Sequence, residues 1–84
     1  MSGIRVSSLP TRTVQEVRKA ILEALSDGEE HAYGDIERKA NTNWRTVRDH
    51  CEDLELFGAV IIAGNKVKIT KQGREILKRL ERNL

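Results

Sequence analysis

The chain has 84 residues, of which 38% are hydrophobic and 33% are charged, and its formal net charge is +2. This length fits one small domain, and the balance of apolar and charged residues is typical of a folded protein in water, which excludes a second core and a disordered chain. No apolar run approaches the roughly 20 residues of a membrane helix, and the first residues lack the apolar block of a signal peptide, so we expect a cytoplasmic protein.

The start of the chain is predicted to be a flexible arm. Residues 1–12 are polar and are interrupted by Gly3 and Pro10, which disfavour regular structure. The arm carries Arg5 and Arg12. The folded domain is therefore expected over residues 13–84.

A first helix is predicted over residues 13–26. Thr13 and Glu16 have the spacing of a capping box, and apolar residues follow at helical period. Gly28 fits the end of this helix, because glycine tolerates the left-handed backbone of a C-cap. The expected apolar stripe consists of Val14, Val17, Ile21, Leu22 and Leu25.

Two further helices joined by a short turn are predicted next. The first covers residues 33–40, and the second, longer one covers residues 43–57. The segment Asn41-Thr42-Asn43 between them consists of turn formers and N-cap residues, and Gly58 stands where a C-cap glycine is expected. Two helices with so short a connection predict a helix-turn-helix.

A β-hairpin and a last helix complete the predicted fold. Residues 59–63 and 66–69 are rich in Val and Ile and are separated by Gly64 and Asn65, which accept the positive φ of a tight turn. The last helix is predicted over residues 71–82, after Thr70 as its cap, with an apolar stripe of Gly73, Ile76, Leu77, Leu80 and Leu84. The predicted fold class is mainly α with a small two-stranded β-hairpin.

This order of elements is similar to that of the winged helix-turn-helix domains of bacterial and archaeal transcription regulators, including the ArsR-like and MarR-like families. The resemblance covers residues 13–84 and is strongest over residues 43–60, NWRTVRDHCEDLELFGAV. That segment resembles a capped helix with a Thr-Val pair and two core leucines, followed by Gly-Leu-Val. Residues 69–73, ITKQG, resemble the Leu-Thr-x-x-Gly that follows the wing. The resemblance implies a prokaryotic regulator of transcription that binds double-stranded DNA.

The helix over residues 43–57 is the predicted DNA-reading element. A step of 100° per residue places Val47, Cys51 and Leu54 on one buried stripe and turns Arg45 and Arg48 toward solvent. In a helix-turn-helix the start of this helix enters the major groove, where arginine pairs with guanine, so these two arginines are the expected base contacts. Asn43 and Thr46 are expected to reach a base edge or a phosphate. The alternative is that both arginines are solvated charges, with Arg48 paired to Glu52.

Acidic residues on the same helix argue against DNA binding. Asp49, Glu52, Asp53 and Glu55 would repel phosphates unless they lie back from the DNA backbone. Asp49 is a candidate base contact, because a carboxylate accepts a hydrogen bond from cytosine N4, although a solvated charge is the simpler interpretation. The alternative function is therefore a winged helix that binds protein or RNA.

Aromatic residues at the starts of the two helices have two interpretations each. Trp44 is expected either to cover the edge of the core or to contact a phosphate. The Tyr33 hydroxyl is expected either to meet a phosphate near the helix N-terminus or to belong to ordinary packing.

The hairpin is predicted to act as a wing on the DNA backbone. Lys66 and Lys68 alternate with apolar residues, so both ammonium groups lie on one face, and Asn65 lies at the tip. Together with Arg12 and Lys71 they extend a basic surface that gives sequence-independent affinity. The alternative is that the lysines only keep an exposed strand soluble.

The last helix is predicted to join two subunits. Leu77, Leu80 and Leu84 extend an apolar stripe to the end of the sequence, and Leu56 points outward from the preceding helix. The resembled families dimerise through terminal helices, so we expect a homodimer. The alternative is that the last helix folds back on the first.

No catalytic, metal or cofactor site is predicted. Cys51 is expected to be a core residue, and its neighbour His50 diverges from it by about 100° on the helix, so the imidazole cannot activate the thiol. His31 is far from His50 in sequence, and no metal-ligand spacing or small-molecule effector site is evident. The protein is therefore not expected to be an enzyme.

Overall fold

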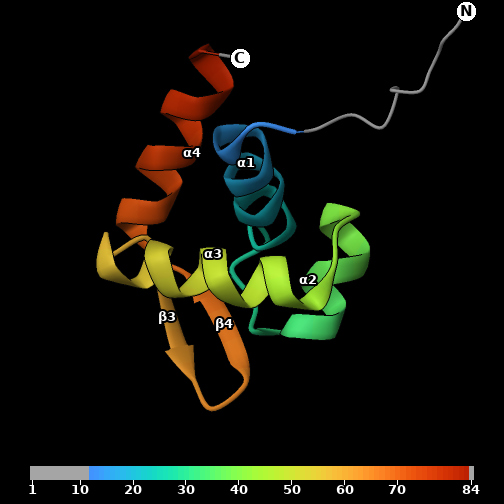
Figure 1. The fold of residues 1–84 in the computed structure, drawn as a ribbon. Coiled ribbons are helices and arrows are strands. Elements are labelled where there is room, and N and C mark those ends of the chain that lie inside the picture. The colour runs from blue at the N-terminus through green and yellow to red at the C-terminus, as the bar shows by residue number, and fades with distance from the viewer. Residues whose placement is uncertain (1–11, 84) are drawn as a thin grey trace, which may run out of the picture.

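The computed structural model describes residues 12–83, which form four helices and a three-stranded antiparallel sheet (Figure 1). In chain order the elements are α1 (Val14–Ala24), β2 (His31–Ala32), α2 (Tyr33–Ala40), α3 (Trp44–Leu56), β3 (Val60–Ala63), β4 (Lys66–Ile69) and α4 (Lys71–Asn83). In the view of Figure 1, α3 runs across the middle of the molecule, α1 and α4 stand on one side of it, and the hairpin of β3 and β4 projects from the other. The predicted fold class is confirmed.

The predicted start of α1 is confirmed by its hydrogen bonds. The Glu16 amide donates to Thr13 Oγ1 at 3.1 Å, and the Thr13 amide donates to Glu16 Oε1 at 2.8 Å, which completes the capping box. The helix ends at Ala24, two residues before the predicted end, and the chain then turns through Gly28 at a φ of +80°. Val14 does not belong to the buried stripe as predicted: it is 53% exposed, because the first turn of α1 lies above the layer of α2 and α3 (Figure 1).

One residue of the predicted arm, Arg12, belongs to the described residues. Arg12, placed at the end of a flexible arm, is held against the C-terminus of α2, where its Nη1 donates to the carbonyl oxygens of Ala40 at 2.8 Å and Asn41 at 3.2 Å. Asn41 has a left-handed backbone with a φ of 54°. Residues 1–11, including Arg5, lie outside the described residues.

The sheet has one more strand than predicted. β4 is central, and it pairs with β3 on one side and with β2 on the other, where His31 lies opposite Val67. β2 has only two residues, which is too short for an alternating pattern to show in the sequence. The hairpin turn takes its positive φ at Gly64, with a value of +64°, and not at Asn65.

The core lies where the helices meet the inner face of the sheet. The stripe predicted for α3 is confirmed, because Val47, Cys51 and Leu54 are all at most 1% exposed. α4 is capped by Thr70, whose Oγ1 accepts from the Gly73 amide at 3.0 Å. Within residues 12–83, no helix is both long and apolar enough to cross a membrane.

Candidate nucleic-acid interface

The turn between α2 and α3 presents the start of α3 to solvent. Asn43 is the N-cap of α3, and its Oδ1 accepts from the Thr46 amide at 2.8 Å. The cap therefore occupies the oxygen of this side chain and leaves its amide group on the exposed surface. Arg45 is exposed one residue into the helix, and Thr46 is half-buried beside it.

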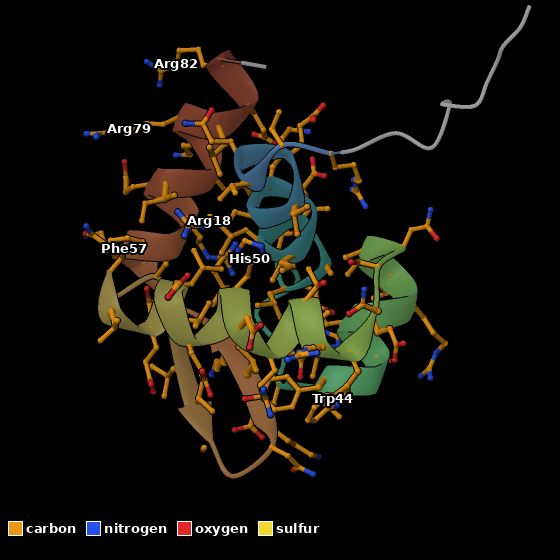
Figure 2. The ribbon with its side chains drawn as sticks, in the orientation of Figure 1. Arg18, Trp44, His50, Phe57, Arg79 and Arg82 are labelled. Carbon is orange, nitrogen blue, oxygen red and sulfur yellow. The ribbon has the colours of Figure 1, made fainter. Side chains whose placement is uncertain are left out.

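Trp44 is the centre of an aromatic and cationic cluster on this surface. Its ring meets the Tyr33 ring edge to face, with 5.8 Å between centroids and an interplanar angle of 82°. The guanidinium of Arg48 lies over the same ring, with Cζ 5.1 Å from the centroid. Trp44 remains 46% exposed, so it both supports its neighbours and faces solvent. Figure 2 shows it at the end of α3 opposite Phe57, on the wing side of the molecule.

Arg48 is more constrained than the sequence predicts. The alternative interpretation pairs Arg48 with Glu52, but Arg48 Nη2 lies 3.5 Å from Asp49 Oδ1, at the edge of the ion-pair range. Its Nε is buried and has no hydrogen-bond partner among the described residues. The stack on Trp44 thus holds the Arg48 guanidinium near the helix surface. Because its one polar contact is weak, most N–H donors of the guanidinium remain available to another molecule.

Two of the four acids on α3 are directed toward the protein itself. Asp53 Oδ2 accepts from Arg18 Nη2 on α1 at 3.3 Å, and Arg18 also lies over the Phe57 ring at 5.4 Å. Glu55 Oε2 accepts from the Ile62 amide on β3 at 3.3 Å. From the sequence, the acids of α3 argue against DNA binding because they would repel phosphates. Two of the four are instead engaged by groups of the protein itself. The sequence pattern gives no sign of the role of Arg18, because its partner is 35 residues away.

The wing shows the predicted alternation of side chains. Lys66 and Lys68 are exposed, whereas Val67 and Ile69 are buried against the helices. Asn65 is exposed at the tip of the hairpin. Lys66 lies opposite Ala32, and the next residue along from Ala32 is Tyr33, which contacts Trp44. The wing and the start of α3 are therefore joined through β2 into one surface.

The leucines predicted to form an interface between subunits differ in burial. Leu77 is 8% exposed and belongs to the core of a single chain, and Leu80 is partly buried against the same core. Leu84 lies outside the described residues. The outward direction predicted for Leu56 is confirmed by its exposed fraction of 84%.

The two histidines and the cysteine occupy different environments. Cys51 is fully buried, and burial raises the pKa of its thiol to about 12, so it stays protonated as a core residue. Burial, and then the nearby Arg18, lower the pKa of His50. His31 is buried with each ring nitrogen facing a carboxylate, Nδ1 to Asp35 at 2.7 Å and Nε2 to Asp27 at 2.9 Å. Among the described residues, no group of three potential ligands could hold a metal ion.

Comparison with known proteins supports the fold described above. The family model described as winged helix-turn-helix matches residues 11–83. No curated protein matches the chain in sequence. Among solved structures, Sso10a-2, a DNA-binding protein from Sulfolobus solfataricus, is similar with a TM-score of 0.74 and 17% identity, over 86% of this chain and 78% of that one.

Two larger bacterial proteins contain a similar fold. Bordetella bronchiseptica BpsR, whose DNA binding is regulated by 6-hydroxynicotinic acid, has a TM-score of 0.69 and 19% identity over 88% of this chain and 56% of its own. The Mycobacterium tuberculosis MarR family protein Rv2887 has a TM-score of 0.68 and 25% identity over 84% of this chain and 53% of its own. This chain therefore spans slightly more than half the length of these two proteins.

Proposed function

Because this chain belongs to the winged helix-turn-helix family, we propose that it binds double-stranded DNA as a transcription regulator in the cytoplasm of a prokaryotic cell. In this proposal, the start of α3 enters the major groove and the wing follows the DNA backbone. The similarity to a DNA-binding protein and to MarR-type regulators supports it.

The observation that carries the proposal is the cluster at the start of α3. Arg45 is exposed and has no ion pair within the described residues, while Trp44 holds Arg48 on the same face. The guanidinium of Arg48, held in this way, loses little conformational freedom when it donates a bidentate pair to guanine. Lys66 and Lys68 on the adjoining wing supply phosphate contacts that fix the position of the helix but carry no sequence information.

Individual residues take distinct roles in this proposal. Arg45 and Arg48 contact bases, and Asp49 accepts from cytosine where the site offers one. Trp44 supports Arg48 from below, and the Asn43 amide, the Thr46 hydroxyl and the Tyr33 hydroxyl donate to phosphates around the start of α3. Asn65 at the wing tip contacts the minor groove.

The proposal is tested by anisotropy titration of labelled duplexes at several salt concentrations. We expect Arg45→Ala/Arg48→Ala to weaken binding by about 1–3 kcal/mol for each bidentate pair with guanine that the variant removes. The slope of log K against log salt should also fall if either arginine neutralises a phosphate. The control is Lys19→Ala/Lys39→Ala, which also removes two positive charges, one from α1 and one from α2, and should bind as wild type. Absence of duplex binding by wild type at low salt would contradict the proposal.

A second candidate function is a module that binds protein or RNA. Leu56, Phe57 and Ile61 are 84%, 56% and 58% exposed near the end of α3 and on β3, and large exposed apolar side chains are typical of protein contacts. Binding of single-stranded RNA, or of a protein, by a chain that binds no duplex would favour this candidate over the first.

We also propose that the protein is a homodimer joined near the ends of α1 and α4. Val14 is 53% exposed and Leu80 is only partly buried, and the start of α1 and the last turns of α4 lie at the same end of the molecule (Figure 1). An isologous contact at this end would cover both residues and leave the two α3 helices free for two half-sites.

A further inference from the structure

Positive charge is concentrated on α4 and not on α3. α4 carries five cationic residues and two acidic ones, Glu75 and Glu81, whereas α3 carries two cationic residues and four acidic ones. The cationic residues of α4 are Lys71, Arg74, Lys78, Arg79 and Arg82. The helix with the largest excess of positive charge is therefore not the one that is proposed to enter the major groove.

The cations of α4 also have no acidic partner among the described residues, a property that they share with Arg45 and the wing lysines Lys66 and Lys68. Arg18, Lys19, Arg38 and Arg48 each pair with a carboxylate within 4.0 Å. Among the described residues, no cation on α4 does so, although Glu75 stands at helical spacing from Arg79. Arg74 Nη1 donates to the Ser26 carbonyl at 3.1 Å, and the other four have exposed side chains with no such contact.

Three of the four exposed cations form a stripe on the face of α4 turned away from the core. A step of 100° per residue places Lys71, Lys78 and Arg82 within about 40° of one another, and on a different side from Leu77 and Leu80. At about 1.5 Å per residue, the stripe from Lys71 to Arg82 is about 16 Å long. Figure 2 shows Arg79 and Arg82 pointing away from the body of the molecule, at the end opposite the wing and Trp44.

We infer that this cationic face of α4 is a second DNA-binding surface, which contacts the phosphates of a second duplex segment. A strand of duplex DNA presents about one phosphate per 3.4 Å along its axis, so a stripe of about 16 Å matches about five phosphates. A duplex held by α3 and the wing lies at the opposite end of the molecule, so the distal arginines meet a different duplex. The inference rests on the proposed function and extends it, because one chain would then hold two DNA segments together.

The test is a bridging assay. One duplex is immobilised on beads, and retention of a second, fluorescent duplex is measured in the presence of the protein. We expect wild type to retain it and Lys78→Gln/Arg79→Gln/Arg82→Gln to reduce this retention at least tenfold, while the variant still binds a single duplex through α3 and the wing. The control is Lys19→Gln/Arg38→Gln/Lys39→Gln, which removes the same charge from α1 and α2 and should bridge as wild type.

Folding and oligomeric state are checked in the same samples. The three α4 side chains are exposed and glutamine is a good helix former, so circular dichroism and the mass by light scattering should match those of wild type. An unchanged mass ensures that a loss of bridging does not come from dissociation of a dimer.

The outcomes of these experiments distinguish failure of this inference from failure of the proposed function. If the α4 variant bridges as well as wild type, or if wild type binds one duplex but never bridges, the inference is overturned and the proposed function stands. If Arg45→Ala/Arg48→Ala leaves duplex binding intact and the α4 variant abolishes it, the α4 surface is supported and the proposed role of α3 fails. If wild type binds phosphatidylserine vesicles but no second duplex, the stripe is a membrane-binding surface and the inference is overturned.

Discussion

His31 links three parts of the fold through its two ring nitrogens and the pairing of its strand. Its Nε2 faces Asp27 in the loop after α1, its Nδ1 faces Asp35 in the first turn of α2, and its own strand pairs with β4 of the wing. The hydrogen bonds to Asp35 and then to Asp27 raise the pKa of His31, and they outweigh burial and the nearby Lys39, which act in the other direction. The doubly protonated ring is the form that satisfies both carboxylates.

The first prediction is that the free energy of unfolding falls as pH rises above neutrality. A raised pKa in the folded state means that the stabilisation is complete below pH 6.5, the ordinary value, and is lost as pH rises through the raised value. The pKa of both aspartates is lowered, so their contribution is lost only in acid, as pH falls below their ordinary value of 3.8. Urea unfolding from pH 6.5 to about pH 8.5 should show the loss in wild type and not in His31→Gln.

His50 provides the matched control for this prediction. Its pKa is lowered, so its effect has the opposite sign and lies below pH 6.5, where protonation favours the unfolded chain. His50→Gln should therefore keep the loss of stability above pH 6.5. A wild-type unfolding free energy that stays flat over that range would show that His31 is not protonated as inferred.

Sequence patterns predict which side chains are exposed better than which side chains pair. Helical and strand periodicity correctly places Arg45 and Asp49 on the surface of α3 and Lys66 and Lys68 on the surface of the wing. Pairs such as Arg18 with Asp53 depend on how α1 crosses α3, which no local period encodes. Arg48 has an acid four residues after it and an aromatic ring four residues before it, and the ring determines its position.

At the scale of elements, the predictions are accurate where a chemical signal marks the boundary. Thr13, Asn43 and Thr70 cap the helices whose predicted starts lie at or directly after them. Gly58 and Gly64 both have a positive φ, at the end of α3 and in the hairpin turn. β2 escapes prediction because its pairing with β4 comes from tertiary structure, and two residues carry neither a period nor a turn signal.

The close approach of Gly73 at the start of α4 to Ala59 gives the second prediction of stability. A Cβ on Gly73 would overlap the Ala59 carbonyl oxygen and would lie 2.8 Å from Ile69 Cγ1. Gly73→Ala should therefore destabilise the fold by about 1–3 kcal/mol, because the clash exceeds the gain of up to about 1 kcal/mol from replacing a helical glycine. Urea unfolding at one pH measures this difference.

Gly34 near the start of α2 is the control for the same substitution. The nearest atom to a Cβ at this position is Arg38 Nη1 at 4.0 Å, so Gly34→Ala meets no obstacle. Its stability should equal or slightly exceed that of wild type. Equal stabilities for Gly73→Ala and wild type would mean that α4 does not dock as closely as the structure indicates.

At the scale of the whole molecule, different faces of α4 serve different proposed contacts. The face of Leu77 packs on the chain's own core, the partly buried Leu80 lies at its edge, and the cationic stripe faces away from both. A dimer formed near Leu80 would thus leave the stripe exposed. The wing and Trp44 at the start of α3 lie on the side of the molecule away from Arg79 and Arg82, so the three proposed contacts do not compete for the same surface (Figure 2).

The last prediction concerns the oligomeric state and is tested by light scattering coupled to size exclusion. If two chains meet near Val14 and Leu80, wild type should have twice the 9.5 kDa mass of one chain, and Leu80→Gln should shift it toward 9.5 kDa, because an amide in an apolar contact lacks a partner. Leu56→Gln changes a leucine that is 84% exposed on α3 and should leave the mass unchanged. If Leu56→Gln dissociates the dimer and Leu80→Gln does not, the subunits meet through α3, and DNA binding and dimerisation would then exclude each other.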